Sequence, residues 1–424
     1  MLCSELVSYF ENGGADKRFA ELYGEKNIIK QRQRYKDAAR NFLSLYGDGE
    51  CVVLSVSGRS EISGNHTDHN KGCVLAASVD VDIIAVVKKT DDGTVRVKSE
   101  GFEEDVCPLD KIPNMKKILY SSKAIIYGVC DGFRRKGYET GGFCAYTTST
   151  VLKGSGLSSS AAFEDMMGYI LSVLYNGGAV PDVEIAKISQ YAENEFFGKP
   201  CGLMDQVACA VGGFVYIDFG GYDPEIIPVP FDLSAAGYDL CIVNTGGNHA
   251  DLNEDYASVP AEMKGVAAVF GKKALRGLKE DDIISKLPEI REKLGDRAAL
   301  RALHFIRENE RVKEQKDALQ NKDIDRFLML AKESGDSSYK YLQNVYTTKN
   351  PYEQGLSLAL CMTEGFLKGS KGAYRVHGGG FAGTVQAYVP AELTDEYKAY
   401  MERIFGTDSC SVLHVRAEGT ARIV

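Results

Sequence analysis

The residues most suited to chemistry lie in one glycine- and serine-rich segment, residues 153–162, with the sequence KGSGLSSSAA. Its two glycines, Gly154 and Gly156, have no side chain, so the backbone amides there can approach a ligand closely. Three consecutive serines follow them: Ser158, Ser159 and Ser160. Backbone amides and hydroxyl groups gathered in one short loop indicate an anion-binding site.

The flanking elements place these serines at the start of a helix. Residues 142–148 are strand-like, and residues 161–174 have helical spacing. Because unpaired N–H groups and the positive end of the helix dipole meet there, phosphate is the expected anion. An ordinary serine N-cap is the alternative, but two glycines and three serines exceed what a cap requires. The segment lacks the ending of a P-loop and the third glycine of the Rossmann fingerprint.

A second polar segment, residues 58–70, follows an expected strand over residues 51–57 and has the sequence GRSEISGNHTDHN. Its residues His66, Asp68 and His69 suggest a metal site, but their spacing is too tight for a usual motif and no second His or Cys cluster completes it. Carboxylate, amide and imidazole groups suit the hydroxyls of a sugar equally well. A polar turn held by its own side chains is the remaining alternative.

Two further segments contain candidate functional residues. Residues 201–206, CGLMDQ, carry Asp205, which is either a helix N-cap or a carboxylate that acts on a substrate hydroxyl as base or orienter. Glu193 precedes it in an expected helix, and spacing alone does not decide between a surface residue and a metal ligand. Residues 377–383, HGGGFAG, contain four glycines, which indicates a backbone packed against another strand or a ligand.

The composition limits the class of protein and its partners. The 424 residues carry a formal net charge of -9, with 44% hydrophobic and 26% charged residues, as in ordinary globular proteins. The negative charge argues against nucleic acid as the main partner. Eleven cysteines without a Cys-x-x-Cys pair favour free, buried thiols in a reducing compartment. We find no signal-peptide pattern and no apolar run long enough for a bilayer, so we expect a soluble, cytoplasmic protein.

The order of the expected elements indicates an α+β protein. The first 50 residues have helical patterns, strand-like runs begin at residue 51, and helical patterns dominate residues 248–367 before strands return. We expect a helical N-terminal extension over residues 1–50, an N-terminal lobe over 51–245 and a C-terminal lobe over 246–424. The ligand site is expected in the cleft between the two lobes.

Taken in chain order, these segments resemble the motifs of the GHMP small-molecule kinases, and residues 58–70 and 201–206 are similar to the galactokinase signatures. The resemblance extends from about residue 51 to the C-terminus. It implies a two-lobed α+β GHMP-kinase fold with mixed sheets and helices and an active site between the lobes. It also implies ATP-dependent phosphorylation of the anomeric hydroxyl of galactose or a similar sugar, with Mg²⁺ and ATP as cofactors.

The resemblance further implies a role for each candidate residue. Asp205 would be the base or would orient the sugar C1 hydroxyl, and Arg59 would lower the pKa of Asp205 and stabilise the transferring phosphoryl group. The ATP phosphates would be held by Gly154, Gly156, Leu157, Ser158, Ser159 and Ser160. Mg²⁺ would be held by Ser159 and Glu193. The sugar would be bound by Arg59, Asn65, His66, Asp68, Asp205 and Tyr256.

The chain departs from the family pattern at several positions. Galactokinases usually have Glu before the His of the first motif, where this chain has Asn65, and that Glu contacts the far hydroxyls of the sugar. His69 stands where Tyr is usual, and Ser60 and Glu61 replace a Val-Asn pair. Because a site that hydrogen-bonds a particular hydroxyl discriminates strongly, these changes bear on the choice of sugar. The helical lead-in up to Gly49 is longer than usual, with no role indicated beyond packing or dimer contact.

Three functions remain open at this point. The first is a galactose 1-kinase, the second is a kinase for another sugar such as N-acetylgalactosamine or arabinose, and the third is a galactose and ATP sensor without turnover. Such sensors lack residues of the serine-alanine run, which is intact here over residues 158–162. The expected partners are therefore ATP and a small sugar, with no nucleic acid and no membrane, and the chain is expected to be a monomer or homodimer.

Overall fold

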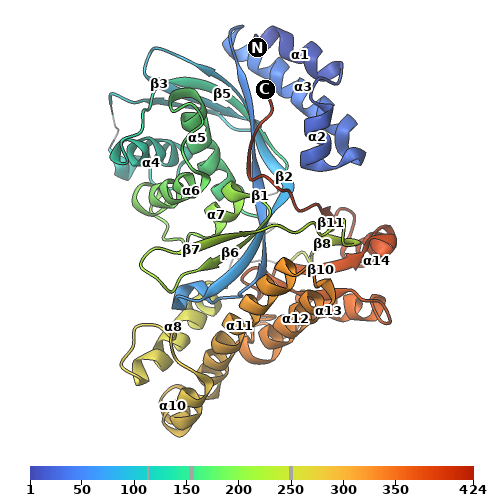
Figure 1. The fold of residues 1–424 in the computed structure, drawn as a ribbon. Coiled ribbons are helices and arrows are strands. Elements are labelled where there is room, and N and C mark those ends of the chain that lie inside the picture. Colours follow the sequence, from blue (N-terminus) through green and yellow to red (C-terminus); the bar gives the residue numbers. More distant parts are fainter. Residues whose placement is uncertain (112–113, 152–156, 248–251) are drawn as a thin grey trace.

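Two β-sheets with helices packed around them make up the fold (Figure 1). The computed structural model describes residues 1–111, 114–151, 157–247 and 252–424. The larger sheet has eight strands in the order β12-β1-β2-β5-β3-β4, with β6 paired to β2 and β7, and the smaller has four in the order β11-β8-β10-β9. Strand β3 runs parallel to β5, whereas β1 and β2 are antiparallel. Mixed sheets and helices confirm the expected α+β class.

The expected strands over residues 51–57 and 142–148 and the expected helix over residues 161–174 correspond to three of the elements of the structure. The strands are β1 (Val52–Ser63), β2 (Cys73–Lys89), β3 (Thr94–Ser99), β4 (Glu104–Pro108), β5 (Phe143–Ser149), β6 (Phe214–Asp218), β7 (Glu225–Val229), β8 (Tyr238–Asn244), β9 (Ala373–His377), β10 (Thr384–Pro390), β11 (Cys410–Leu413) and β12 (Thr420–Arg422). The α-helices are α1 (Cys3–Glu11), α2 (Asp16–Tyr23), α3 (Ile28–Tyr46), α4 (Ser122–Arg135), α5 (Ser159–Tyr175), α6 (Asp182–Tyr191), α7 (Met204–Val211), α8 (Asn253–Val269), α9 (Glu280–Ser285), α10 (Leu287–Leu294), α11 (Asp296–Gln320), α12 (Ile324–Ser337), α13 (Gly355–Phe366) and α14 (Thr394–Phe405). Two π-helical turns, Ala192–Phe197 and Ser338–Leu342, extend α6 and α12.

The N-terminal helices α1–α3 cover one face of the large sheet, and α4–α7 cover the other (Figure 1). Phe10, Phe19, Tyr35 and Phe42 are fully buried in the core that α1–α3 share with β1, β2 and β5. Apolar burial of this kind drives the docking of an amphipathic helix onto a sheet. The expected helical extension over residues 1–50 is thus an integral layer of the fold.

A buried ion cluster fastens α3 to the sheet. Asp82 in β2 is completely buried and pairs with Arg34 of α3 at 2.5 Å and with Arg416 at 3.3 Å. Arg34 also donates to the backbone oxygen of Thr148, at the end of β5, at 3.2 Å. Two buried cations around one carboxylate satisfy the charge that burial would otherwise make costly. The cluster therefore couples the N-terminal helices to β5, the strand that leads into the glycine- and serine-rich segment.

The pairing of β8 and β12 modifies the expected division into lobes. Strand β8 pairs with β10 and β11 in the small sheet, so the boundary expected at residue 245 falls after the first strand of the second sheet. Strand β12, close to the C-terminus, pairs with β1 in the large sheet. The chain thus enters the second sheet early and returns to the first at its end, an exchange that strand patterns along the sequence do not predict.

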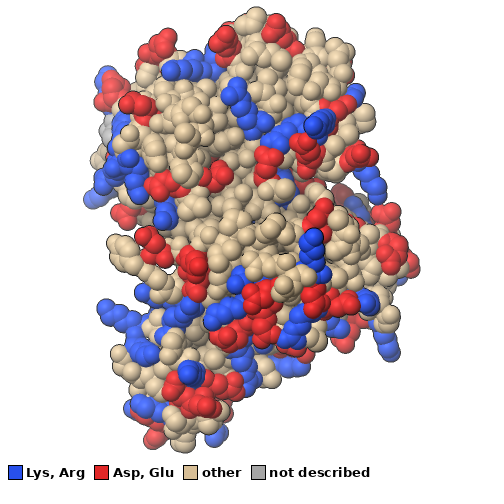
Figure 2. Space-filling model, in the orientation of Figure 1, with Lys and Arg blue, Asp and Glu red and all other residues tan. Residues whose placement is uncertain are grey.

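Surface and thiol chemistry agree with an ordinary globular protein. Lys and Arg are interspersed with Asp and Glu on the face shown in Figure 2. All eleven cysteines are free, and nine of them are buried, as the sequence predicted; Cys201 is half-buried and Cys361 is exposed. Among the described residues, no helix has the length and apolar character needed to cross a membrane.

Candidate active site

Arg59 and Asp205, which are 146 positions apart in the chain, form the centre of the site. Nε and Nη2 of Arg59 donate to the two carboxylate oxygens of Asp205 at 2.9 and 2.7 Å. This paired geometry is the strong form of an Arg–carboxylate interaction. The sequence predicted both residues as catalytic, and the structure brings them into direct contact.

Local backbone features explain how the two residues meet. The register of β1 and β2 shifts between Ser57 and Gly58, immediately before Arg59. A side chain at Gly58 would crowd the backbone oxygen of Leu157, to which the N–H of Arg59 donates at 3.2 Å. Asp205 lies in the first turn of α7. The strand that carries the cation is therefore packed directly against the loop that leads into α5.

Ser158 connects this pair to the start of α5. It precedes the first residue of that helix with a left-handed backbone, at φ 55°, and its hydroxyl donates to Asp205. Leu157 is buried, Ser158 and Ser159 are half-buried, and Ser160 is exposed. Gly154 and Gly156, predicted to bind phosphate, lie outside the described residues. The serines thus occupy the N-terminus of a helix, as expected for a phosphate site.

The electrostatic environment keeps Asp205 ionised. Burial alone would raise its pKa, but the charge of Arg59 and the hydrogen bonds from Arg59 and Ser158 outweigh burial, so that the pKa lies below its ordinary value. A carboxylate in this state can accept a hydrogen bond from a hydroxyl and orient it. The predicted effect of Arg59 on the pKa of Asp205 agrees with this geometry.

Glu193, in the π-helical turn Ala192–Phe197, is almost fully buried. Nε2 of Gln206 donates to Glu193 and to Glu164 of α5, each at 3.0 Å, and so bridges the two carboxylates. Burial first, and then repulsion from Glu193, raise the pKa of Glu164 to about 8. Nζ of Lys199 lies 3.6 Å from Glu193. A buried carboxylate that has a lysine ammonium group beside it can also bind a metal ion in place of that group.

The two predicted metal ligands carry groups that suit Mg²⁺. The hydroxyl of Ser159 and the carboxylate of Glu193 are oxygen donors, which Mg²⁺ prefers, and it commonly takes one or two protein ligands together with phosphates. The described part of the chain contains no group of three or more His, Cys, Asp or Glu residues suited to a metal. The described residues therefore do not form a metal site made of protein ligands alone.

Two of the predicted sugar-binding residues, His66 and Tyr256, contact the glycine loop between β9 and β10. Nε2 of His66 lies 2.9 Å from the backbone oxygen of Gly379. The hydroxyl of Tyr256 donates to the backbone oxygen of Gly380 at 2.8 Å. A side chain at Gly202, in the loop before Asp205, would come within 3.1 Å of Asp68. These contacts place His66 and Tyr256 beside the glycine loop and Asp68 beside the loop that leads to Asp205.

Asn65 is placed differently from its neighbours. Its side chain is completely buried. Its Nδ2 donates to Oε1 of Glu61 at 2.9 Å and to the backbone oxygen of Gly378 at 2.6 Å, and its Oδ1 accepts from Nδ2 of Asn344 at 2.6 Å. Both the nitrogen and the oxygen of the Asn65 amide are thus hydrogen-bonded to protein groups. This arrangement favours a structural role over the direct contact with a sugar that its position in the motif predicts.

Several residues around the site were not among the predicted site residues. Glu61, Glu164, Lys199, Gln206 and Asn344 all contact predicted site residues. Glu164 could have been noticed as an acidic residue within the otherwise apolar helix after the serines. Asn344 could not, because it lies in a loop far from every motif and meets Asn65 only through folding.

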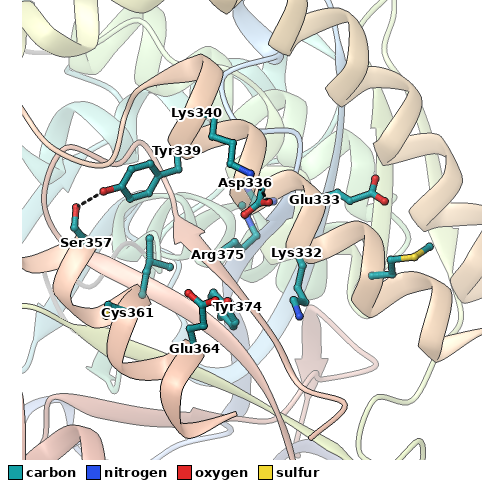
Figure 3. Close-up of a pocket in the computed structure, with 13 residues that line it drawn as sticks. Lys332, Glu333, Asp336, Tyr339, Lys340, Ser357, Cys361, Glu364, Tyr374 and Arg375 are labelled. Atoms are coloured by element: carbon teal, nitrogen blue, oxygen red, sulfur yellow. Dashed lines mark hydrogen bonds and ion pairs between the residues drawn. The ribbon is translucent and has the colours of Figure 1, made fainter. Parts of the chain in front are cut away.

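A separate hollow of about 650 Å³ lies between α12, α13 and β9 (Figure 3). Its lining includes Lys332, Asp336, Tyr339 and Arg375. Nη1 of Arg375 also donates to the backbone oxygen of Ile62 in β1 at 2.8 Å. Arg375 therefore connects this hollow to the strand that carries Arg59.

Comparison with known proteins agrees with this fold and site. The family model of the GHMP kinases N terminal domain matches residues 124–213, and that of the galactokinase galactose-binding signature matches residues 40–89. The chain superimposes on the crystal structure of Lactococcus lactis galactokinase complexed with galactose with a TM-score of 0.73 and 22% identity, covering 90% of this chain and 98% of that one. A crystal structure of mevalonate kinase gives a TM-score of 0.57 at 16% identity, covering 86% of this chain and 99% of that one. The fold and the site therefore define a GHMP kinase, a phosphotransferase with an alcohol group as acceptor.

Sequence comparison narrows the class to one family. Galactokinase from Streptomyces coelicolor is 32% identical over 372 residues, covering 86% of this chain and 91% of that protein. Galactokinase from Glaesserella parasuis is 33% identical over 354 residues, covering 82% and 87%. The chain belongs to the galactokinase family and is a sugar kinase, so the resemblance stated from the motifs is confirmed.

Proposed function

We propose that this protein transfers the γ-phosphoryl group of ATP to the anomeric hydroxyl of galactose, giving galactose 1-phosphate and ADP, in the cytoplasm. The observation that carries the proposal is the Arg59–Asp205 pair, which Ser158 ties to the helix start expected to hold the phosphates. A carboxylate, a cation and an anion-binding helix terminus are the parts that phosphoryl transfer to an alcohol requires.

In this proposal Asp205 acts on the sugar. Its ionised carboxylate accepts the hydrogen of the C1 hydroxyl and either removes the proton or orients the oxygen. The C1 oxygen forms a bond to the γ-phosphorus, the bond from that phosphorus to the bridging oxygen of ADP breaks, and ADP leaves. Arg59 holds Asp205 in place and offers its positive charge to the transferring group.

The phosphates are held by the start of α5. The proposed ligands are the backbone and hydroxyl groups of Ser158, Ser159 and Ser160, together with Leu157 and the two glycines before it. Ser159 and Glu193 are the proposed ligands of Mg²⁺, which would neutralise charge on the phosphates. Gln206 fixes the carboxylate of Glu193 for this purpose, because its amide donates to it.

The sugar is proposed to lie among Asp205, Asp68, His66 and Tyr256. Burial lowers the pKa of His66, so this ring is neutral near pH 7 and can exchange a hydrogen bond with a hydroxyl without adding charge. Tyr256 packs edge-on against Phe381, with ring centroids 5.4 Å apart. The aromatic contact fixes the tyrosine against the glycine loop, where it helps to enclose the sugar.

Two alternatives remain, a kinase for another sugar and a sensor that binds galactose and ATP without turnover. ADP release is the discriminating measurement, with Mg-ATP and a panel of galactose, N-acetylgalactosamine, arabinose, glucose, glucuronate and no sugar. Turnover with galactose above all others supports the proposal. Turnover with a different sugar supports the second function, and binding of both ligands without ADP release supports the third.

A further inference from the structure

Two of the residues that depart from the family pattern in the sugar loop, Glu61 and Asn65, are exchanged in type with each other. Where the family has Asn and then, four positions later, Glu, this chain has Glu61 and then Asn65. The two side chains are in contact, since Nδ2 of Asn65 donates to Oε1 of Glu61 at 2.9 Å. The loop therefore still contains one carboxylate and one amide in contact, but each stands at the position that the other has in the family.

The backbone aims Glu61 toward the active site. Residues 59 and 61 pair with Ser78 and Ala76 of β2 in continuous register, so Arg59 and Glu61 lie on the same face of β1. Arg59 on that face contacts Asp205. Burial lowers the pKa of His66 and the charge of Glu61 opposes this shift, which places the carboxylate within electrostatic reach of His66 as well. Glu61 thus shares a strand face with Arg59 and contacts Asn65, the residue before His66.

The hydrogen bonds leave Glu61 with an unused acceptor. Its Oε1 accepts from Asn65 and lies 3.8 Å from Nη2 of Arg375, a cation only 1% exposed. Within the described part of the chain, no hydrogen bond reaches Oε2, and the side chain is 10% exposed. Asn65, by contrast, has no exposed surface and is engaged by Glu61, Gly378 and Asn344. Only the carboxylate can accept a further bond from a ligand.

We propose that Glu61 determines sugar specificity by accepting a hydrogen bond from a hydroxyl at the end of the sugar remote from C1, and that Asn65 positions Glu61 and His66. This inference rests on the proposed sugar-kinase function. A carboxylate acceptor requires a hydroxyl donor, so the site selects a neutral aldose with that hydroxyl over the analogue that lacks it. The same negative charge disfavours a uronic acid, whose carboxylate would face Glu61.

The reciprocal exchange provides the test. Glu61→Gln removes the charge at nearly constant shape, and Asn65→Glu places two carboxylates side by side and removes the donor to Gly378. The double variant Glu61→Asn/Asn65→Glu restores the family order with one carboxylate and one amide. Glu103→Gln, at an exposed position, is the matched control. Coupling within the pair is measured by a double-mutant cycle, for which Glu61→Asn is made as the second single variant beside Asn65→Glu.

For each variant, kcat and KM are measured with galactose and with 6-deoxygalactose, together with KM for ATP. We expect Glu61→Gln to raise KM for galactose at least tenfold, to leave KM for ATP unchanged, and to remove the preference for galactose over its 6-deoxy analogue. Asn65→Glu alone should lose at least as much, and the double variant should recover most of that loss. An unchanged preference between the two sugars in Glu61→Gln overturns the inference, as does a double variant no better than the worse single one.

Failure of the kinase function itself is recognised separately. Wild-type protein that releases no ADP with any sugar contradicts the proposed function, while the inference about Glu61 is then tested by sugar-induced thermal stabilisation, which needs no turnover. Stabilisation by galactose that is lost in Glu61→Gln supports the inference, and equal stabilisation of both proteins overturns it. Melting of each variant without ligand shows whether Asn65→Glu still folds, and Glu61→Gln carries the test if it does not.

Discussion

Nζ of Lys199 lies 3.6 Å from Oε1 of Glu193, the carboxylate expected to hold the metal. The lysine side chain is 63% exposed and that of Glu193 only 4%. An exposed cation therefore lies beside a nearly buried carboxylate and competes with any other cation that approaches it.

We predict that Lys199→Gln lowers the Mg²⁺ concentration needed for half-maximal activity, because Nζ no longer competes for Oε1. Stability should change little, since an ion pair with one exposed partner contributes about 0–1 kcal/mol. Mg²⁺ titrations at saturating ATP and sugar measure the effect, with Lys293→Gln, an exposed lysine that pairs with Glu289 in α10, as control. An unchanged Mg²⁺ requirement would mean that the lysine does not occupy the position of the metal.

The second prediction concerns Asp205. Asp205→Asn keeps the size of the side chain but removes the charge, so we expect kcat to fall about 10²–10⁴-fold, the usual contribution of a positioned base. Arg59→Ala should be as damaging, because it removes the group that holds Asp205 ionised. Single-turnover ADP formation measures the loss, and circular dichroism confirms that the fold is kept. Activity near that of wild type in either variant would contradict the proposed mechanism.

The third prediction separates two glycines of the loop between β9 and β10. Both Gly378 and Gly380 have a positive φ, 67° and 79°, so alanine is strained at either, at a cost of about 1–3 kcal/mol. A Cβ at Gly380 would also overlap the backbone oxygen of Asn344, whereas nothing lies within 4 Å of a Cβ at Gly378.

Gly380→Ala should therefore be destabilised more than Gly378→Ala and should also raise KM for the sugar, because Tyr256 bonds to Gly380 and Asn344 bonds to Asn65. Urea denaturation and sugar kinetics compare the two variants. Equal behaviour of the pair would show that the clash is relieved by movement of the loop.

Short-range patterns predicted most helices and strands and identified the family motifs. They could do so because helix and strand periodicity and glycine-rich loops are local properties of the sequence. The contact between Arg59 and Asp205 followed only from the family resemblance, since 146 residues separate them. The place of the N-terminal helices was not predictable at all. It depends on the pairing of Arg34 with Asp82 in a strand of another layer, and no local pattern carries that information.

The exchange of Glu61 and Asn65 also shows that a sequence pattern alone does not reveal which side chains are in contact. Each departure was visible in the sequence, and each alone weakened the expected sugar site. Only their contact shows that the two changes compensate, because it is the hydrogen bond between them that preserves a carboxylate at this place. The residue types in the motif therefore predicted the kind of chemistry. The hydrogen-bond partners of Glu61 and Asn65 indicate which of the two residues is available for it.

The last prediction concerns stability and pH at His304 in α11. The ring is fully buried, with Nδ1 2.8 Å from Oγ of Ser337 and Nε2 3.1 Å from the backbone oxygen of Asn65. Since the carbonyl can only accept, Nε2 carries the proton and Nδ1 accepts from the serine, which is the neutral form. Burial lowers the pKa of His304 to about 4, although the nearby Glu308 opposes the shift.

The unfolded chain therefore binds a proton at His304 below about pH 6.5 and the folded chain does so only below about pH 4. Through this window His304 lowers the free energy of unfolding by about 1 kcal/mol for each unit of decreasing pH. Relative to wild type, His304→Gln should lose stability at pH 7, where the two hydrogen bonds are disturbed, and this deficit should shrink toward pH 5. The exposed His69→Gln is the matched control, and urea unfolding at both pH values gives the difference. A deficit that stays constant between pH 7 and pH 5 would show that His304 is protonated in the folded protein and that the neutral form assigned from its partners is wrong.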